Sequence, residues 1–450
     1  MAVTTISRRQ ALLGAGALAG LGLAGCGGAS NYDAPYVPGY RETQRLIERY
    51  VREGKVAGAS VVLKTLNAAP MTLSAGRVSL ESGAAAAAED TIWRVYSMSK
   101  PITGIAAMIL IQDGRLALDQ PIGEIVPAFA NMRVLANRET METRPARTQI
   151  TVRHLLTHTA GFSYTIINEP VLSRLYRQHG LFAAGRQVRL EEGDGQPPAT
   201  LEEFGERLAA LPLSYEPGAW WRYSVSLDVL GLVIQRASGV PFDQFLERRL
   251  FRPLSMSDTG FYVPQQKLSR FATNYIVEDG RLQVLDDHNN SAFANAQGVP
   301  YGGAGIVSTA RDYARFCEML LNGGALDGQR VLSRENVRIA TTNLLPEGID
   351  RNATGLEGAD FGAGMGIVTE ASARPGEAPP GAYSWGGAAG TTMWVDPVNA
   401  AYVVGMTQYM PSNAYPIWRE LREAAYRDFA ALRDPNRRAL DITDRPRRNF

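Results

Sequence analysis

An almost uninterrupted apolar run from Ile102 to Ile111 is the feature that most constrains the fold of this chain. The run ends at Gln112-Asp113-Gly114, and a glycine just after the last apolar residue is typical of a helix C-terminus. A helix that is apolar on every side must be buried on every side. The sequence therefore predicts a central helix surrounded by other layers of structure.

The composition agrees with a large core and excludes several classes of protein. The 450 residues are 45% hydrophobic and 20% charged, as in a globular protein. The formal net charge of +1 and the absence of a basic run with aromatic residues argue against nucleic acid as a partner. Cys26 and Cys317 stand far apart and outside any CxxC motif, which excludes a disulfide framework and a zinc finger.

Strand signals lie near both ends of the chain, and the middle is mostly helical in pattern. An amphipathic helix around 46–51 opens the chain, and a final helix is expected at 414–432. Strands are expected at 59–63, 72–78, 305–308, 364–369, 391–395 and 402–407. This order predicts an α+β fold: an antiparallel sheet built from both chain ends, flanked by helices, with a mostly helical inserted region and a cleft between the two parts.

These patterns suggest four segments. They are an export signal at 1–26, a linker at 27–39, one domain at 40–432 and a C-terminal tail at 433–450. Within the domain, the α/β part is expected at about 40–114 and 296–432, and the mostly helical part at about 115–295.

The first residues indicate export. Arg8 and Arg9 precede an apolar run from Ala11 to Ala24 that is too short to span a bilayer. The paired arginines resemble a twin-arginine export signal, and Leu23 to Cys26 resembles the lipobox of bacterial lipoproteins. The sequence thus predicts a periplasmic lipoprotein anchored to a membrane through a lipid on Cys26. The alternative is an ordinary secretory peptide whose cysteine is incidental.

Ser97 and Lys100 stand three residues apart at the start of the apolar run. Residues i and i+3 of a helix share a face, about 5–6 Å apart at Cβ, so the hydroxyl and the amine can meet. Apolar surroundings and the positive end of a helix both disfavour the ammonium form, which would let Lys100 accept the Ser97 proton. No Gly-x-Ser-x-Gly elbow occurs in the chain, so a serine here needs an activator of this kind.

Two later segments offer partners for this pair. Tyr223 precedes an apolar helical run and could shuttle protons in the cleft. Trp385, Gly386 and Gly387 lead into a strand whose backbone could approach a substrate closely and supply an oxyanion donor. The alternatives are a buried, hydrogen-bonded tyrosine and a glycine-rich β-bulge.

Taken together, these motifs resemble the serine β-lactamase and penicillin-binding protein superfamily, and most closely the class C β-lactamase-like family VIII carboxylesterases. The segments Thr151 to Gly161 and Tyr301 to Ser308 resemble framework signatures of that family. The resemblance implies Ser97 as the acylated nucleophile and Lys100 and Tyr223 as general bases and acids. It further implies an oxyanion hole formed by the backbone N–H groups of Ser97 and Ala388, and it implies no cofactor or metal.

Two departures from true β-lactamases bear on the substrate. Trp385-Gly386-Gly387 stands where those enzymes usually carry Lys-Thr-Gly, which removes a cation that would pair with a carboxylate. Val225 stands in place of an asparagine and cannot hydrogen-bond a substrate amide. Both changes favour uncharged ester substrates over β-lactams.

Several alternatives stay open. A β-lactamase, D,D-peptidase or acyltransferase would use the same residues, and a catalytically silent lipoprotein could keep the fold as a binding module. His154 and His158 could be two metal ligands one helical turn apart, but no third ligand is indicated, and a framework role near the cleft is favoured.

Overall fold

The computed structural model describes residues 39–433, apart from 67, 138, 183–189, 297, 353–354 and 375. The expected export signal, the lipid attachment at Cys26, almost all of the linker and the tail beyond Arg433 lie outside the described residues.

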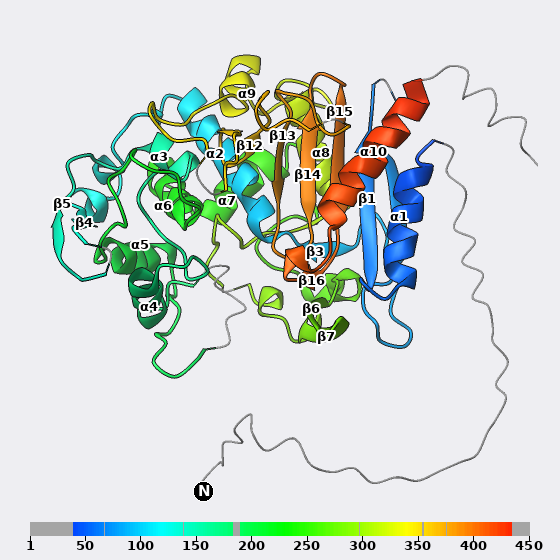
Figure 1. The fold of residues 1–450 in the computed structure, drawn as a ribbon, viewed down its shortest axis with the longest axis horizontal. Coiled ribbons are helices and arrows are strands. Elements are labelled where there is room, and N and C mark those ends of the chain that lie inside the picture. Colours follow the sequence, from blue (N-terminus) through cyan, green and yellow to red (C-terminus); the bar gives the residue numbers. More distant parts are fainter. Residues whose placement is uncertain are drawn as a thin grey trace, which may run out of the picture. The chain divides into compact units, whose positions relative to one another are not determined.

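A seven-stranded antiparallel sheet forms the centre of the α/β part (Figure 1). Its strands, in spatial order, are β11 (Asp360–Phe361), β12 (Gly366–Ile367), β13 (Tyr383–Gly386), β14 (Thr392–Asp396), β15 (Ala401–Met406), β1 (Gly58–Lys64) and β2 (Met71–Gly76). The strands expected at 59–63 and 72–78 form the β1–β2 hairpin. On its other side β1 pairs with β15, with Val62 opposite Val404. The sheet is thus assembled from both ends of the chain, as the strand signals predict.

Helices cover both faces of this sheet. The helices α1 (Arg41–Arg52) and α10 (Ile417–Arg433) pack side by side in front of it, and α8 (Ala310–Leu321) lies behind it against β14 and β15 (Figure 1). The apolar face of α1 buries Leu46, Ile47 and Tyr50, as its periodicity predicts. Cys317 on α8 is fully buried, which raises the pKa of its thiol.

The buried central helix is α2 (Ser99–Gln112), whose residues are buried from Ser99 through Leu110. It contacts α6 (Ser226–Ser238) on the helical side and α9 (Arg334–Ala340) on the other. Gly114 follows the helix with a φ of +68°, the left-handed conformation that favours glycine. The expectation drawn from the apolar run is confirmed.

The inserted region is mostly helical, but it also contains strands that its pattern does not predict. Its helices are α3 (Val152–Leu156), α4 (Pro170–Gln178), α5 (Leu201–Ala209), α6 and α7 (Phe242–Leu246); its strands are β4 (Arg133–Leu135), β5 (Thr143–Pro145), β6 (Asn274–Glu278) and β7 (Arg281–Asp286). The strand β7 escapes prediction because it is largely exposed, including Val284 and Leu285, so it lacks the usual alternation. A short C-terminal strand, β16 (Tyr409–Met410), pairs parallel with β6.

The remaining elements are short. Two small strand pairs are β3 (Ile92–Arg94) with β8 (Val307–Thr309) and β9 (Ala325–Leu326) with β10 (Gln329–Arg330). Short 3-10 helices occur at Tyr96–Met98 (η1), Ile122–Glu124, Pro127–Phe129, Gln265–Arg270, Ala292–Ala294 and Ser412–Ala414, and a π turn at Glu247–Phe251.

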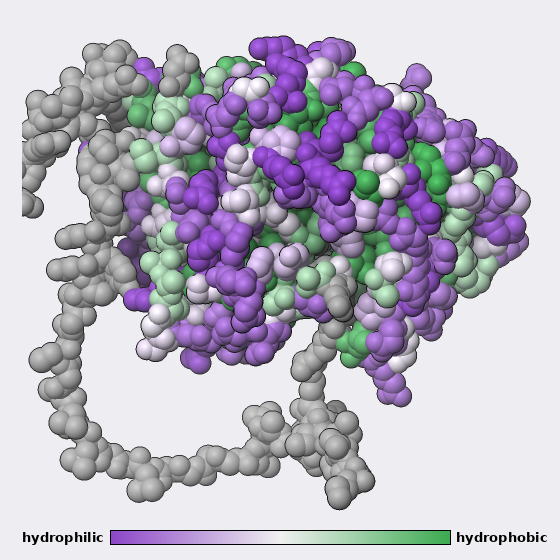
Figure 2. Space-filling model, turned by 180° about the vertical axis from the view of Figure 1, so that it is seen from behind, coloured by the Kyte–Doolittle hydropathy of each residue, from purple (hydrophilic) through white to green (hydrophobic). Residues whose placement is uncertain are grey.

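The surface opposite the view of Figure 1 is mainly hydrophilic, with hydrophobic residues in scattered groups (Figure 2). Within the part of the chain that the structure describes, none of the helices combines the length and the apolar character needed to cross a membrane.

Candidate active site

Ser97 lies in the 3-10 turn η1, between β3 and α2. The sequence predicts that it opens the helix itself; instead α2 begins at Ser99, and Tyr96 just before the serine has a φ of +44°. A non-glycine residue at positive φ turns the chain sharply. Side chains at i and i+3 are also aligned in a 3-10 turn, so Ser97 and Lys100 still meet.

Two side chains converge on the Ser97 hydroxyl. The Tyr223 hydroxyl donates a hydrogen bond to Ser97 Oγ over 2.6 Å, and Lys100 Nζ lies 3.3 Å from the same oxygen. Tyr223 reaches it from the segment just before α6, where the sequence places it. The structure therefore brings together Ser97, Lys100 and Tyr223, the three residues singled out for chemistry.

Lys100 is enclosed among polar and aromatic groups. Its side chain is fully buried, and Nζ donates to the carbonyl of Gly303 over 2.8 Å. The same nitrogen lies 4.5 Å from the ring centroid of Tyr223 and 5.5 Å from that of Tyr164. Aromatic faces attract an ammonium group, so these rings hold the lysine beside Ser97.

A cavity of about 880 Å³ opens in front of Ser97. Tyr223 lines it, together with Trp385, Gly386, Gly387 and Ala388, which are the predicted substrate-binding and oxyanion residues. Much of the remaining wall is apolar or aromatic: Ile166, Ile167, Trp220, Trp221 and Trp418. Ile166 and Trp220 are also exposed to solvent, so the mouth of the cavity is hydrophobic.

Comparison with known proteins settles the family. The family model described as Beta-lactamase matches residues 43–426. The chain belongs to the beta-lactamase family. Protein Rv1367c of Mycobacterium tuberculosis is 37% identical over 336 residues, covering 72% of this chain and 78% of the relative. Esterase EstB of Burkholderia gladioli is 28% identical over 411 residues, covering 85% of this chain and 93% of the relative.

Solved structures agree with this assignment. The hydrolase EstCE1, described as having promiscuous acyltransferase activity, superposes with a TM-score of 0.72 and 26% identity over 86% of this chain and 98% of its own. Simvastatin synthase LovD of Aspergillus terreus has a TM-score of 0.73 at 24% identity over 89% of this chain and 100% of its own, which shows the shared fold. The β-lactamase/transpeptidase-like fold expected from the motifs is confirmed.

In this beta-lactamase-family site, the glycines after Trp385 let β13 approach the nucleophile segment. A side chain at Gly387 would collide with the carbonyl of Val95, and one at Gly386 would press on Trp418. The N–H of Gly387 donates to the carbonyl of Thr391 over 2.8 Å. By contrast, among the described residues the N–H groups of Ser97 and Ala388 have no hydrogen-bond partner.

Both arginines of the cavity wall are paired. Arg222 forms an ion pair of 2.6 Å with Glu169, and Arg422 forms one of 3.1 Å with Glu377. Each guanidinium charge is therefore balanced by a carboxylate of the protein. Trp385, which lines the same cavity, carries no charge.

His158 and His154 each accept a backbone hydrogen bond through Nδ1. The N–H of Ser224 donates to His158 Nδ1 over 3.3 Å, and the N–H of Thr151 donates to His154 Nδ1 over 3.2 Å within a capping box. Burial lowers the pKa of both imidazoles, to about 4 for His154 and well below its usual value for His158. Both rings thus accept backbone N–H groups as neutral imidazoles.

Sequence reasoning missed Asp228, which is buried behind Lys100 in the first turn of α6. Its Oδ1 accepts the N–H of Gly303 over 2.8 Å, and its Oδ2 lies 3.5 Å from the hydroxyl of Tyr164. A signal was present, because Asp228 interrupts an otherwise apolar helical run.

Proposed function

We propose that this protein is a serine hydrolase that cleaves carboxylic esters through a covalent acyl-enzyme on Ser97. The observation that carries the proposal is the contact of Ser97 Oγ with both Tyr223 Oη, at 2.6 Å, and Lys100 Nζ, at 3.3 Å, at the wall of a large cavity. A hydroxyl within hydrogen-bond reach of two proton-transfer groups is an activated nucleophile. The names of Esterase EstB and the hydrolase EstCE1 support the same reaction class.

The reaction has two steps. Ser97 Oγ attacks the ester carbonyl while its proton passes either to the Tyr223 phenolate, which the Lys100 ammonium stabilises, or to Lys100 in its neutral form. The N–H groups of Ser97 and Ala388 stabilise the oxyanion. The alcohol then leaves with that proton, and the acyl group stays on Ser97. Water, activated by the same residues, attacks the acyl-enzyme and releases the acid.

The cavity favours a small-molecule ester without charge. Its aromatic and aliphatic walls suit apolar acyl or alcohol groups. Because Arg222 and Arg422 are each paired with a glutamate, they offer little attraction to a substrate carboxylate. The absence of a lysine at Trp385 supports the same preference.

Covalent labelling tests the nucleophile. After exposure of the purified, signal-free domain to a fluorophosphonate, peptide mass spectrometry is expected to find the adduct on Ser97. Ser384 lines the same cavity and serves as a matched control that stays unmodified. Ser97→Ala should abolish turnover of a p-nitrophenyl ester while Ser384→Ala retains it. Labelling of another serine, or of none, would contradict the proposal.

Acyl transfer to an alcohol is a second candidate. EstCE1 is described as a hydrolase with promiscuous acyltransferase activity, and the cavity of about 880 Å³ has room for an acceptor beside the acyl group. Adding an apolar alcohol to the ester assay would yield the transesterified product if acceptors compete with water. Release of the free acid alone would leave hydrolysis as the reaction.

We also propose that the protein is exported and anchored through a lipid on Cys26, from the motif at its N-terminus. Metabolic labelling with an alkynyl fatty acid in a bacterial host is the test. Incorporation that is lost in Cys26→Ala supports the anchor, and a soluble periplasmic product without label contradicts it.

A further inference from the structure

A carboxylate that takes no part in the proposed reaction lies behind Lys100. Asp228 is only 4% exposed, and its side-chain oxygens are contacted by the N–H of Gly303 and the hydroxyl of Tyr164. An isolated charge in a protein interior is strongly unfavourable unless other groups compensate it. The environment of Asp228 must therefore supply that compensation.

A single residue, Gly303, connects Asp228 to Lys100 through its two neighbouring peptide groups. The N–H of Gly303 donates to Asp228 Oδ1 over 2.8 Å, while the carbonyl of Gly303 accepts from Lys100 Nζ over 2.8 Å. Asp228 thus fixes the backbone that presents the Gly303 carbonyl to Lys100, and the buried anion and cation attract each other across this residue. A Cβ atom at position 303 would lie 2.5 Å from Asp228 Oδ2, so glycine is required for this approach.

The charged and titratable groups around the pair come from four segments. Burial raises the pKa of the Asp228 carboxyl to about 6, although the positive charge of Lys100 from α2 acts in the opposite direction. The Tyr164 hydroxyl lies 3.5 Å from Asp228 Oδ2, and the rings of Tyr164 and Tyr223 face Lys100 Nζ. His158 is buried nearby and also feels the Lys100 charge. Lys100 is therefore the cation that faces Asp228.

We infer that the Asp228 carboxylate is the counter-charge that holds the Lys100 ammonium beside Ser97, acting across the backbone of Gly303. Asp228 is then a positioning residue, since it reaches the nucleophile only through Lys100. The inference rests on the proposed function for the role of Lys100, but the charge coupling itself is a property of the resting protein and is measurable without turnover.

The test follows the ionisation of Lys100 directly. The chain contains only four lysines, Lys55, Lys64, Lys100 and Lys267, so NMR of protein labelled at lysine Cε gives few signals, and the Lys100→Arg variant assigns the relevant one. Asp228→Asn removes the charge but keeps an oxygen that can accept the Gly303 N–H. In this variant, the pH midpoint of the Lys100 signal is expected to fall by about 1 pH unit or more.

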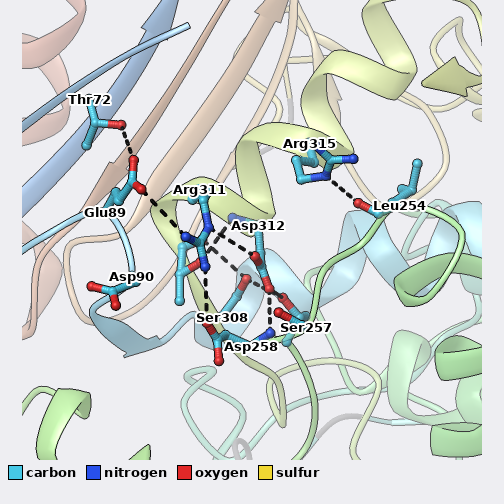
Figure 3. A network of polar contacts seen from close by, with 12 residues as sticks. Thr72, Glu89, Asp90, Leu254, Ser257, Asp258, Ser308, Arg311, Asp312 and Arg315 are labelled. Carbon is cyan, nitrogen blue, oxygen red and sulfur yellow. Dashed lines mark hydrogen bonds and ion pairs between the residues drawn. The ribbon is translucent and has the colours of Figure 1, made fainter. Parts of the chain in front are cut away.

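A matched control is available in Asp312→Asn. Asp312 is another buried carboxylate that accepts a backbone N–H, from Asp258 over 2.7 Å, but it lies in a separate polar network with Thr259 and Arg311 (Figure 3). The Lys100 midpoint should be unchanged in this variant. An unchanged midpoint in Asp228→Asn, or an equal fall in both variants, would overturn the inference.

The wild-type protein provides a second measurement if Asp228→Asn does not fold. Titration of Asp228 should appear as a separate inflection of the Lys100 signal near pH 6, and a flat signal there would overturn the inference. These outcomes are independent of the Ser97 labelling experiment. Failure of the proposed esterase reaction and failure of the charge coupling are therefore distinguishable.

Discussion

The imidazole ring of His158 lies against the phenol ring of Tyr223, with the ring centroids 4.8 Å apart. The backbone on both sides of Tyr223 is also bound to His158: Arg222 donates its N–H to the carbonyl, over 3.0 Å, and Ser224 donates to Nδ1. One residue therefore fixes the position of the tyrosine that touches Ser97.

We expect His158→Phe to impair catalysis more than binding. Phenylalanine keeps a ring against Tyr223 but cannot accept the Ser224 N–H, so the phenol shifts relative to Ser97. A misplacement of about 1 Å can reduce the rate about 100-fold, and kcat should fall by about 10- to 100-fold with little change in KM. Steady-state kinetics with a p-nitrophenyl ester measures both. The control is His154→Gln, and equal losses in the two variants would contradict the role of His158.

Removing the Tyr223 hydroxyl should have a larger effect. Tyr223→Phe deletes the group that lies 2.6 Å from Ser97 Oγ, and loss of a general acid–base group typically costs about 10²- to 10⁴-fold in rate. The matched variant is Tyr164→Phe, whose hydroxyl faces Asp228 instead of Ser97. Its loss in kcat should be much smaller. Wild-type activity in Tyr223→Phe would remove this residue from the mechanism.

Ester hydrolysis should decline at acidic pH because Asp228 becomes protonated. The pKa of this buried carboxyl is about 6, so the carboxylate is charged above that pH and neutral below it. The log of kcat/KM for a non-ionising ester is expected to bend downward as pH falls through about 6. Asp228→Asn should be less active at pH 8 and should lack this bend. If the pH profile of the variant bends at the same pH, another group is responsible for the bend.

His154 should make the fold sensitive to acid. Burial lowers the pKa of His154 to about 4 in the folded protein, whereas an unfolded histidine titrates near 6.5. The unfolded chain therefore binds more protons between these values, and stability is full above about pH 6.5 and is lost as pH falls toward 4. At pH 5 the loss is about 2 kcal/mol in the free energy of unfolding.

Thermal unfolding at pH 7.5 and pH 5 tests this expectation. Glutamine can still accept the Thr151 N–H but does not titrate, so His154→Gln should show a smaller fall in Tm between the two pH values than the wild type. An identical fall would mean that other groups control the acid sensitivity.

Trp385→Ala is expected to change selectivity more than chemistry. Its ring lies 5.8 Å from that of Tyr223 and 5.3 Å from that of Phe361, at the cavity wall, without touching the Ser97 hydroxyl. The ratio of kcat/KM between long-chain and short-chain esters should therefore shift. A uniform loss across a panel of chain lengths would contradict this view.

Hydrophobic periodicity predicted most of the helices and strands of the fold. The elements that it did not predict are exposed or depend on an unusual local backbone conformation. The apolar run of α2 predicts a helix that is buried on all sides, and the amphipathic pattern of α1 predicts a helix that is buried on one face. The exposed strand β7 offers no such pattern. The 3-10 turn at Ser97 depends on the positive φ of Tyr96. A tyrosine in the sequence gives no indication of this backbone conformation.

The candidate site was predictable where it depends on motif spacing. Ser97, Lys100 and Tyr223 meet as the pattern indicated. Asp228 was not predicted, because its role depends on the contact with the backbone of Gly303, which is distant in the sequence. A charged residue inside an apolar run is a usable signal only when its neighbours in space are known.

The pairing of β1 with β15 has a consequence for biosynthesis. Strand β1 can complete its pairing only after β15, which is synthesised more than 300 residues later. Such distant pairing is slow to form, and until then the open edge of β1 can pair with other chains. A nascent or truncated polypeptide that ends before β15 should consequently need chaperone protection, and the hydrolase should gain activity only after its last strands are synthesised.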